Sequence, residues 1–166
     1  MQLLSRQAGA TVRVADEVWV ATALLHRENP KREDFEIREI VERAAKENLH
    51  PTRRPGVYVH VVQHCVANRR ADPGRHRMLY ETQPGHRRLF RAGDDWHPDR
   101  KDGRIVPTAD ALPERYRDLL EWYGRWSGSD VQAAEDPILG LRGLGSEIWV
   151  DEVADEYVAR LRSGWE

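Results

Sequence analysis

The chain is poor in cysteine and has no long hydrophobic run. Cys65 is the one cysteine in 166 residues, so an internal disulfide is excluded and a reducing cytoplasm is expected. No apolar segment approaches the roughly 18–20 residues that cross a bilayer, and we therefore expect no membrane contact. The first residues also lack a continuous apolar stretch, so we expect no signal peptide.

Charge is sorted along the chain. The net charge is only −2. Residues 50–91 nevertheless hold nine arginines against two acids, and residues 110–166 hold thirteen acids against six arginines. Because phosphate contacts supply most sequence-independent affinity for nucleic acids, the basic middle predicts a nucleic-acid surface. The acidic tail needs a separate explanation.

Apolar spacing predicts a run of helices in the first half of the chain. The first begins near Ala15, with Asp16 as its cap. The second is capped by Asp34 and ends at Asn48. Pro55 suits the first turn of a third helix over residues 56–70, although its β-branched residues leave a strand as the alternative.

Two β-type runs follow, at 75–82 and 86–93, and the Pro-Gly pair between them predicts a hairpin. A last helix is expected from Pro113. This order predicts an α+β fold, a winged helix-turn-helix-like domain with a β-hairpin wing and an extended acidic amphipathic tail. The expected divisions are a lead-in at 1–14, the domain at 15–126, a linker at 127–135 and the tail at 136–166.

In this interpretation the third helix reads base edges in the major groove. Its core face is Tyr58, Val61, Val62 and Cys65. The opposite face carries polar side chains that can contact base edges, namely His60, Gln63, His64 and Asn68. Phosphate contacts are expected from the arginines at both ends of the helix and on the hairpin, namely Arg53, Arg54, Arg69, Arg70, Arg75, Arg77, Arg87, Arg88 and Arg91.

Residues 16–126 also resemble an uncharacterised bacterial winged-helix-like family. The segments that carry this resemblance are RPGVYVHVVQHCVAN, RMLYET, RRLFRAGDDWHPDR and LPERYRDLLEWY. The resemblance covers about two-thirds of the chain. It implies the fold and no established reaction.

The tail carries a ridge of large apolar residues at every fourth position, from Trp149 to Trp165. Residues 136–166 resemble the C-terminal segment of type II antitoxins that partner PIN-domain toxins. The resemblance implies a DNA-binding domain followed by a toxin-binding tail. The residues expected to contact the toxin are Leu139, Leu141, Arg142, Leu144, Trp149, Val153, Tyr157, Leu161, Arg162 and Trp165.

Other chemistry is weakly supported. His60 and His64 have the spacing of a helical zinc pair, but no HExxH glutamate accompanies them, so no metal or cofactor is expected. Asp99 and Lys101 have the D-x-K spacing found in some nucleases, but such a site needs further carboxylates held on adjacent strands, and this pair lies in a polar loop. Cys65 lies among valines, where a thiolate is disfavoured. We expect no catalytic residues and no enzyme.

The sequence therefore predicts a dimeric transcriptional regulator of the antitoxin kind. It would bind its operator as double-stranded DNA and would also bind a toxin. The alternative is a protein-interaction module whose acidic tail pairs with, or autoinhibits, the basic face.

Overall fold

The structure is a computed structural model that describes residues 12–128. The chain divides into two units, Met1–Ser129 and Asp130–Glu166, and the described residues fall within the first. The expected lead-in up to residue 11, most of the linker and the whole tail lie outside the described residues. Every residue expected to contact a toxin therefore lies outside them too.

The described residues form an α+β arrangement with a small antiparallel sheet. The elements in chain order are α1 (Val14–Glu28), β1 (Phe35–Glu36), α2 (Ile37–Glu47), α3 (Gly56–Val59) continued by a π-helical turn (His60–His64), β2 (Leu79–Gln83), β3 (His86–Leu89) and α4 (Asp118–Ser127). Single 3-10 turns lie at Pro98–Arg100, Ala109–Ala111 and Glu114–Tyr116. The sheet has three strands in the order β1-β3-β2, and both pairings are antiparallel. This arrangement is compatible with a winged-helix-like fold.

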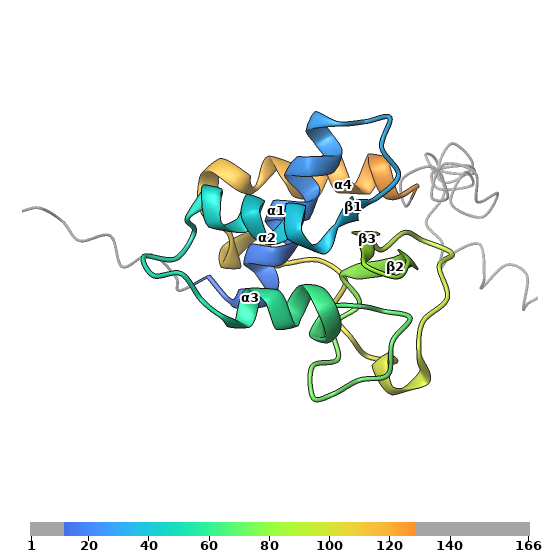
Figure 1. The fold of residues 1–166 in the computed structure, drawn as a ribbon. Helices are drawn as coiled ribbons and strands as arrows, with labels where there is room; N and C mark the ends of the chain where they lie inside the picture. Colours follow the sequence, from blue (N-terminus) through green and yellow to red (C-terminus); the bar gives the residue numbers. More distant parts are fainter. Residues whose placement is uncertain (1–11, 129–166) are drawn as a thin grey trace, which may run out of the picture. The chain divides into compact units, whose positions relative to one another are not determined.

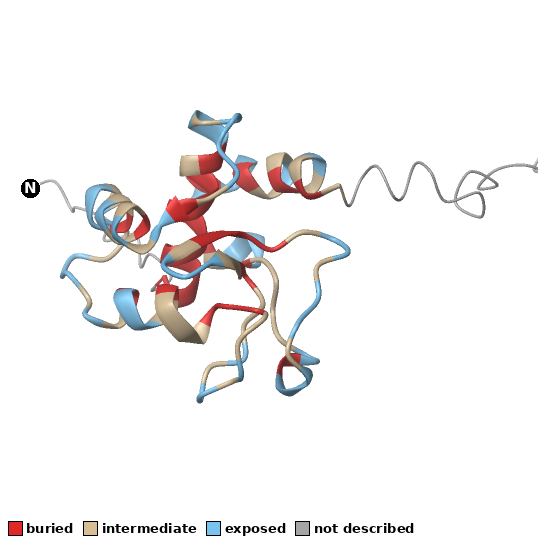
Figure 2. Cartoon of the chain, turned by 45° about the vertical axis from the view of Figure 1, so that its right-hand side comes forward, coloured by how far each residue is buried: buried red, intermediate tan, exposed pale blue. Residues whose placement is uncertain are grey.

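Helix α1 runs through the middle of this unit, with α2, α3 and α4 around it (Figure 1). Its middle part is apolar on every side, and a helix of that kind must be covered on every side. Val18, Trp19, Val20 and Ala21 have no exposed surface. Buried residues accordingly concentrate on α1 and the strands (Figure 2). The Trp19 ring meets the Tyr123 ring of α4 edge-on at 5.6 Å.

Both predicted helix caps are wrong. Arg13 occupies the cap of α1, and Asp16 lies one turn inside, fully buried, with its carboxylate 2.7 Å from the Arg104 guanidinium. Glu36 caps α2 in a reciprocal capping box with Glu39. Asp34 instead accepts hydrogen bonds from the hairpin, so tertiary contacts decide where these carboxylates lie.

The predicted hairpin is confirmed, with shorter strands. Pro84 and Gly85 form its turn, and Gly85 has a φ of 82°, which favours a residue without a Cβ. The predicted end of α2 is also confirmed, because Asn48 adopts the left-handed conformation. β1 was not predicted. Two residues are too few for a periodic signal, and Phe35 and Glu36 are strand only because they pair with Arg87 and His86.

The third helix is shorter than predicted. It leaves the helical path at Cys65, whose N–H donates to the His60 carbonyl at 3.0 Å and closes the π turn. Val66 then forms a parallel bridge with Leu79 at the start of β2. The chain therefore leaves the helix to pair with the sheet at a point where β-branched residues make a helix less favourable. None of the helices in residues 12–128 is long and apolar enough to span a membrane.

Candidate nucleic-acid interface

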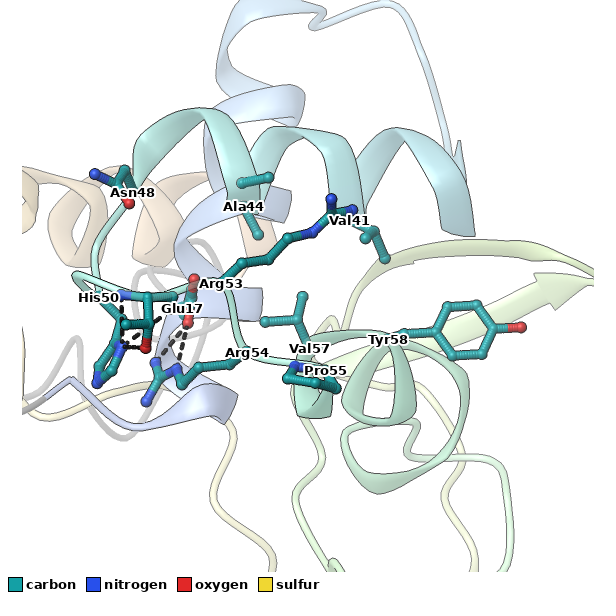
Figure 3. Close-up of a pocket in the computed structure, with 12 residues that line it drawn as sticks. Glu17, Val41, Ala44, Asn48, His50, Arg53, Arg54, Pro55, Val57 and Tyr58 are labelled. Atoms are coloured by element: carbon teal, nitrogen blue, oxygen red, sulfur yellow. Dashed lines mark hydrogen bonds and ion pairs between the residues drawn. The ribbon is translucent and has the colours of Figure 1, made fainter.

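Helix α3 presents one apolar side to the core and another to solvent. Val57 and Val61 are buried against the core. Tyr58 was expected to join them, but it is 58% exposed, and its ring projects away from the helix (Figure 3). Val59 beside it is 43% exposed. Placing Tyr58 in the core was therefore wrong, because α3 is covered on one side only.

The polar side chains predicted to read bases are used inside the protein. His60 Nδ1 lies 2.8 Å from the Gly56 carbonyl oxygen. Gln63 donates its amide to the Arg70 carbonyl. Asn68 does not lie on the helix: its amide exchanges two hydrogen bonds of 2.9 Å with the main chain of Glu81, as a neighbouring strand would. Asn68 uses both ends of its amide, and His60 and Gln63 each hold a main-chain carbonyl, so a base would have to compete with these contacts.

Three histidines cluster where α3 meets the following loop. The His60 and His64 rings lie 4.9 Å apart edge-on, and the His76 ring stacks 6.5 Å from His60. Burial lowers the pKa of His60, and burial together with the Arg104 charge lowers the pKa of His76 to about 4. Among the described residues, no group of histidines, cysteines and acids is arranged to hold a metal ion.

Arg87 of the hairpin is a buried structural residue, which contradicts its predicted contact with phosphate. It is only 1% exposed, and its guanidinium lies 2.6 Å from the Glu81 carboxylate. It also donates to the main-chain carbonyls of Val61 and Val62, at 3.1 and 3.3 Å. Arg87 therefore ties the sheet to α3 and lies too deep in the fold to reach a phosphate.

Arg88 is likewise withdrawn from solvent, being 7% exposed. It donates to both carboxylate oxygens of Asp94, at 2.6 and 2.7 Å, and lies over the Tyr80 ring. Arg91 lies over the Trp126 ring, 4.5 Å from its centroid, and burial lowers its pKa. The predicted phosphate-binding role of Arg88 is thus also contradicted, because the two terminal nitrogens of its guanidinium are bound to the two Asp94 carboxylate oxygens.

Arg54, Arg69 and Arg77 are half-buried and already have partners. Arg54 pairs with Glu17 of α1, whose side chain is 7% exposed, and donates to the Val12 carbonyl. Arg69 lies 2.7 Å from the Glu81 carboxylate. Arg77 lies over the Trp96 ring at 4.6 Å. These arginines hold loops against the core, so they are poor candidates for phosphate contacts.

Arg53, Arg70 and Arg75 remain open to solvent. The Arg70 side chain is 83% exposed and lies 3.6 Å from Asp99, a loose surface pair. Within residues 12–128, Arg53 and Arg75 are exposed and have no ion-pair partner. Of the predicted phosphate-binding arginines, these three can still reach a phosphate without giving up a contact in the fold.

A hollow brings part of this surface together. Its lining comes from the start of α2, the loop before α3, the hairpin turn and α3 itself. It includes two arginines and two glutamates around an aromatic ring, namely Arg38, Arg53, Glu36, Glu42 and Tyr58. A second hollow adjoins it on the far side of Arg53, between α2 and the loop before α3. Figure 3 shows Arg53 reaching across this second hollow toward Val41, while Arg54 turns to Glu17.

Arg100 organises the loops behind α3 and was not predicted. It is fully buried, and it donates only to main-chain carbonyls. The acceptors are the carbonyls of Gln63, His64, Arg69, Arg70 and His76. A buried cation at the C-terminal end of a helix is favoured by the helix dipole. Its place in a Pro-bounded polar loop gave no signal of this role.

The residues considered for catalysis lie apart from the exposed side of α3. Burial raises the pKa of the Cys65 thiol, which has no exposed surface. Asp99 pairs loosely with Arg70, and the fully exposed Lys101 lies outside both hollows around α3. The candidate interface is therefore defined by the exposed side of α3 and the hairpin turn. No protein-family model matches this chain, and no curated protein or solved structure matches it either.

Proposed function

We propose that this protein binds double-stranded DNA through the exposed side of α3 and acts as a transcriptional regulator. The observation that carries the proposal is the shared hollow, which places Arg53, unpaired within residues 12–128, beside Tyr58 and the hairpin turn. A helix that stands out from the body of a small domain can enter the major groove, while cations beside it contact the phosphates.

The internal pairing of the arginines changes the expected electrostatics. Each neutralised phosphate contributes about −0.9 to the slope of log affinity against log salt concentration. Arg53, Arg70 and Arg75 are the three predicted contacts that stay free, so the slope is about −3 per protomer. Nine free arginines would have given a much steeper dependence.

Fluorescence anisotropy tests the proposal. Full-length protein is titrated against the DNA upstream of its own gene and against a scrambled duplex, at several salt concentrations. We expect tighter binding to the upstream duplex with the shallow slope given above. Absence of binding to either duplex at low salt would overturn the proposal.

A matched pair of double variants locates the surface. Arg53→Ala with Arg75→Ala removes two exposed charges, one in the hollow beside Tyr58 and one in the loop after α3. Arg117→Ala with Arg125→Ala removes two exposed charges at α4. The first variant is expected to weaken binding to both duplexes and flatten the salt slope by about two phosphates. Equal loss in the two variants would mean that only net charge matters.

We further propose that residues 136–166 bind a PIN-domain toxin. The support is the apolar spacing of the tail and its resemblance to antitoxin tails. Trp149→Ala with Tyr157→Ala is expected to abolish co-purification with the proposed PIN-domain toxin, while DNA affinity is unchanged. Retained co-purification would overturn this part of the proposal alone.

The competing function is a protein-interaction module in which the acidic tail neutralises the basic face. Tyr58 and Val59, exposed next to each other on α3, favour a protein partner. The withdrawal of Arg54, Arg87 and Arg88 into the fold counts against the electrostatic part of this alternative, because little basic face remains. A shortened chain, residues 1–128, that gains DNA affinity would favour it.

A further inference from the structure

The solvent side of α3 is apolar rather than polar. Tyr58 and Val59 are two of the three large hydrophobic residues that are exposed in residues 12–128. Val62, one turn further along, is half-exposed. The polar side chains expected there, those of His60 and Gln63, have main-chain partners instead. A partner that binds this side of α3 therefore meets methyl groups and one aromatic ring before it meets a hydrogen-bonding group.

The major groove offers a single apolar group. Adenine, guanine and cytosine present only hydrogen-bond donors and acceptors there, whereas thymine adds its C5-methyl group. An isopropyl side chain in the groove contributes most binding free energy where it covers that methyl group, because both apolar surfaces are then buried from water. A base step without thymine would instead place polar base edges against Val59 and leave them without partners.

We propose that α3 recognises thymine through its C5-methyl group, with Val59 and Tyr58 as the contacting side chains. The inference rests on the proposed DNA binding and names what is read. It replaces adenine recognition by Gln63 and Asn68, whose amides are bound to Arg70 and Glu81. The Tyr58 hydroxyl remains available for a phosphate or a base edge on the same side.

Within the described part of the chain, one unpaired cation beside this patch favours DNA as its occupant. Arg53 lines the same hollow as Tyr58 and has no ion-pair partner among the described residues. Arg38 lines the hollow too, but Glu36 and Glu42 line it as well and lie 3.9 and 3.8 Å from the Arg38 guanidinium, so Arg38 is already paired. A phosphate backbone supplies anions at the edge of an apolar strip, and Arg53 can neutralise one of them.

The test begins with a selected duplex. Full-length protein enriches binders from a pool whose random centre covers about two helical turns of DNA. The best duplex is then synthesised with thymine and, separately, with uracil at every thymine position, which removes only the methyl groups. We expect uracil to weaken binding about fourfold for each contacted methyl.

The outcomes separate the two proposals. If no DNA sequence is enriched and the protein binds no duplex at low salt, the proposed function itself is overturned. Enrichment followed by equal affinity for the thymine and uracil duplexes retains DNA binding and overturns the thymine inference. An enriched sequence that contains no thymine overturns the inference in the same way.

A double-mutant cycle assigns the contact to Val59. Val59→Ala is expected to weaken binding to the thymine duplex about threefold to fourfold and to leave the uracil duplex unaffected. A variant that merely misfolds would lose affinity for both duplexes equally. Val59→Thr keeps the shape, replaces one methyl with a hydroxyl and serves as the conservative control. Equal losses on the two duplexes would overturn the assignment of Val59.

Discussion

Helix α3 and the hairpin were expected to share one task, yet their side chains are arranged in opposite ways. The hairpin turns Arg87 and Arg88 inward, where Glu81 and Asp94 neutralise them. Helix α3 turns Tyr58 and Val59 outward, although both are apolar. At these four residues polarity does not predict exposure. The available partners do: Arg87 has a carboxylate and carbonyls within reach, while the Tyr58 ring lines an open hollow and is 58% exposed.

The largest expected effect comes from Arg100, which supports α3 from behind. Arg100→Ala removes a buried donor group from five main-chain carbonyls, of which those of Gln63 and Arg70 keep a second donor. We expect the free energy of unfolding to fall by about 3–5 kcal/mol, measured by urea denaturation. Arg75→Ala, at an exposed arginine, is the matched control and should change it by less than about 0.5 kcal/mol. A small loss for Arg100→Ala would mean that the loops hold without it.

Arg87 tests the hairpin side of the comparison. Arg87→Ala leaves the Glu81 carboxylate without one of its two guanidinium partners, and we expect a loss of about 3 kcal/mol in unfolding free energy. Any loss of DNA binding should then follow the unfolded fraction, and the salt slope of the folded protein should stay unchanged. A flattened slope at full stability would restore Arg87 to the interface.

A pH titration probes His26, which joins α1 to the sheet. Its Nε2 accepts a hydrogen bond from the Leu89 N–H at 3.2 Å, and burial lowers its pKa from 6.5 to about 3. The folded state therefore binds the proton more weakly than the unfolded state. The stabilisation that neutral His26 gives to the fold is complete above pH 6.5 and is lost as the pH falls toward 3, by about 1 kcal/mol per pH unit. Thermal unfolding measured from pH 7 to pH 4 follows this loss of stability.

A His26→Gln variant is the control for that titration. The Gln carbonyl can still accept a hydrogen bond but does not bind a proton in this range. Its unfolding temperature should depend less on pH than that of the unsubstituted protein. An unchanged pH dependence would place the titration elsewhere, with His76 as the next group to examine.

The smallest effect on stability is expected at Tyr58. The ring is mostly exposed, so Tyr58→Ala should change the unfolding free energy by less than about 0.5 kcal/mol. The same variant should weaken binding to the selected duplex several-fold. Loss of stability without loss of binding would show that the ring packs on the domain and that α3 does not use it.

The order of the helices and the hairpin could be predicted because it depends on local signals. Helical spacing predicted α1 and α2, Asn48 ended α2, and the Pro-Gly pair placed the hairpin turn. β1 escaped prediction because Phe35 and Glu36 are strand only through their pairing with β3. The end of α3 escaped for a similar reason, since Val66 leaves the helix to bridge Leu79.

The candidate site was predicted less well than the fold. Sequence spacing identifies which residues share a side of a helix, and it placed Val61 and Cys65 correctly in the core. Sequence spacing does not say which residue elsewhere in the chain will form a hydrogen bond or ion pair with a given side chain. Gln63 meets the Arg70 carbonyl, and Arg54 meets Glu17 thirty-seven positions away, and neither contact leaves a trace in local composition.

The position of Arg100 in the chain also affects the order of folding. The end of α3 and the loop after it are held by a side chain that emerges from the ribosome only after both hairpin strands. Because domains fold during synthesis as their contacts become available, the nascent chain carries an unsupported α3 until residue 100 is present. A fragment that stops after the hairpin would contain α1 to α3 and both hairpin strands and still lack this support. The shortest stable fragment that carries the proposed DNA-binding surface must therefore extend through Arg100.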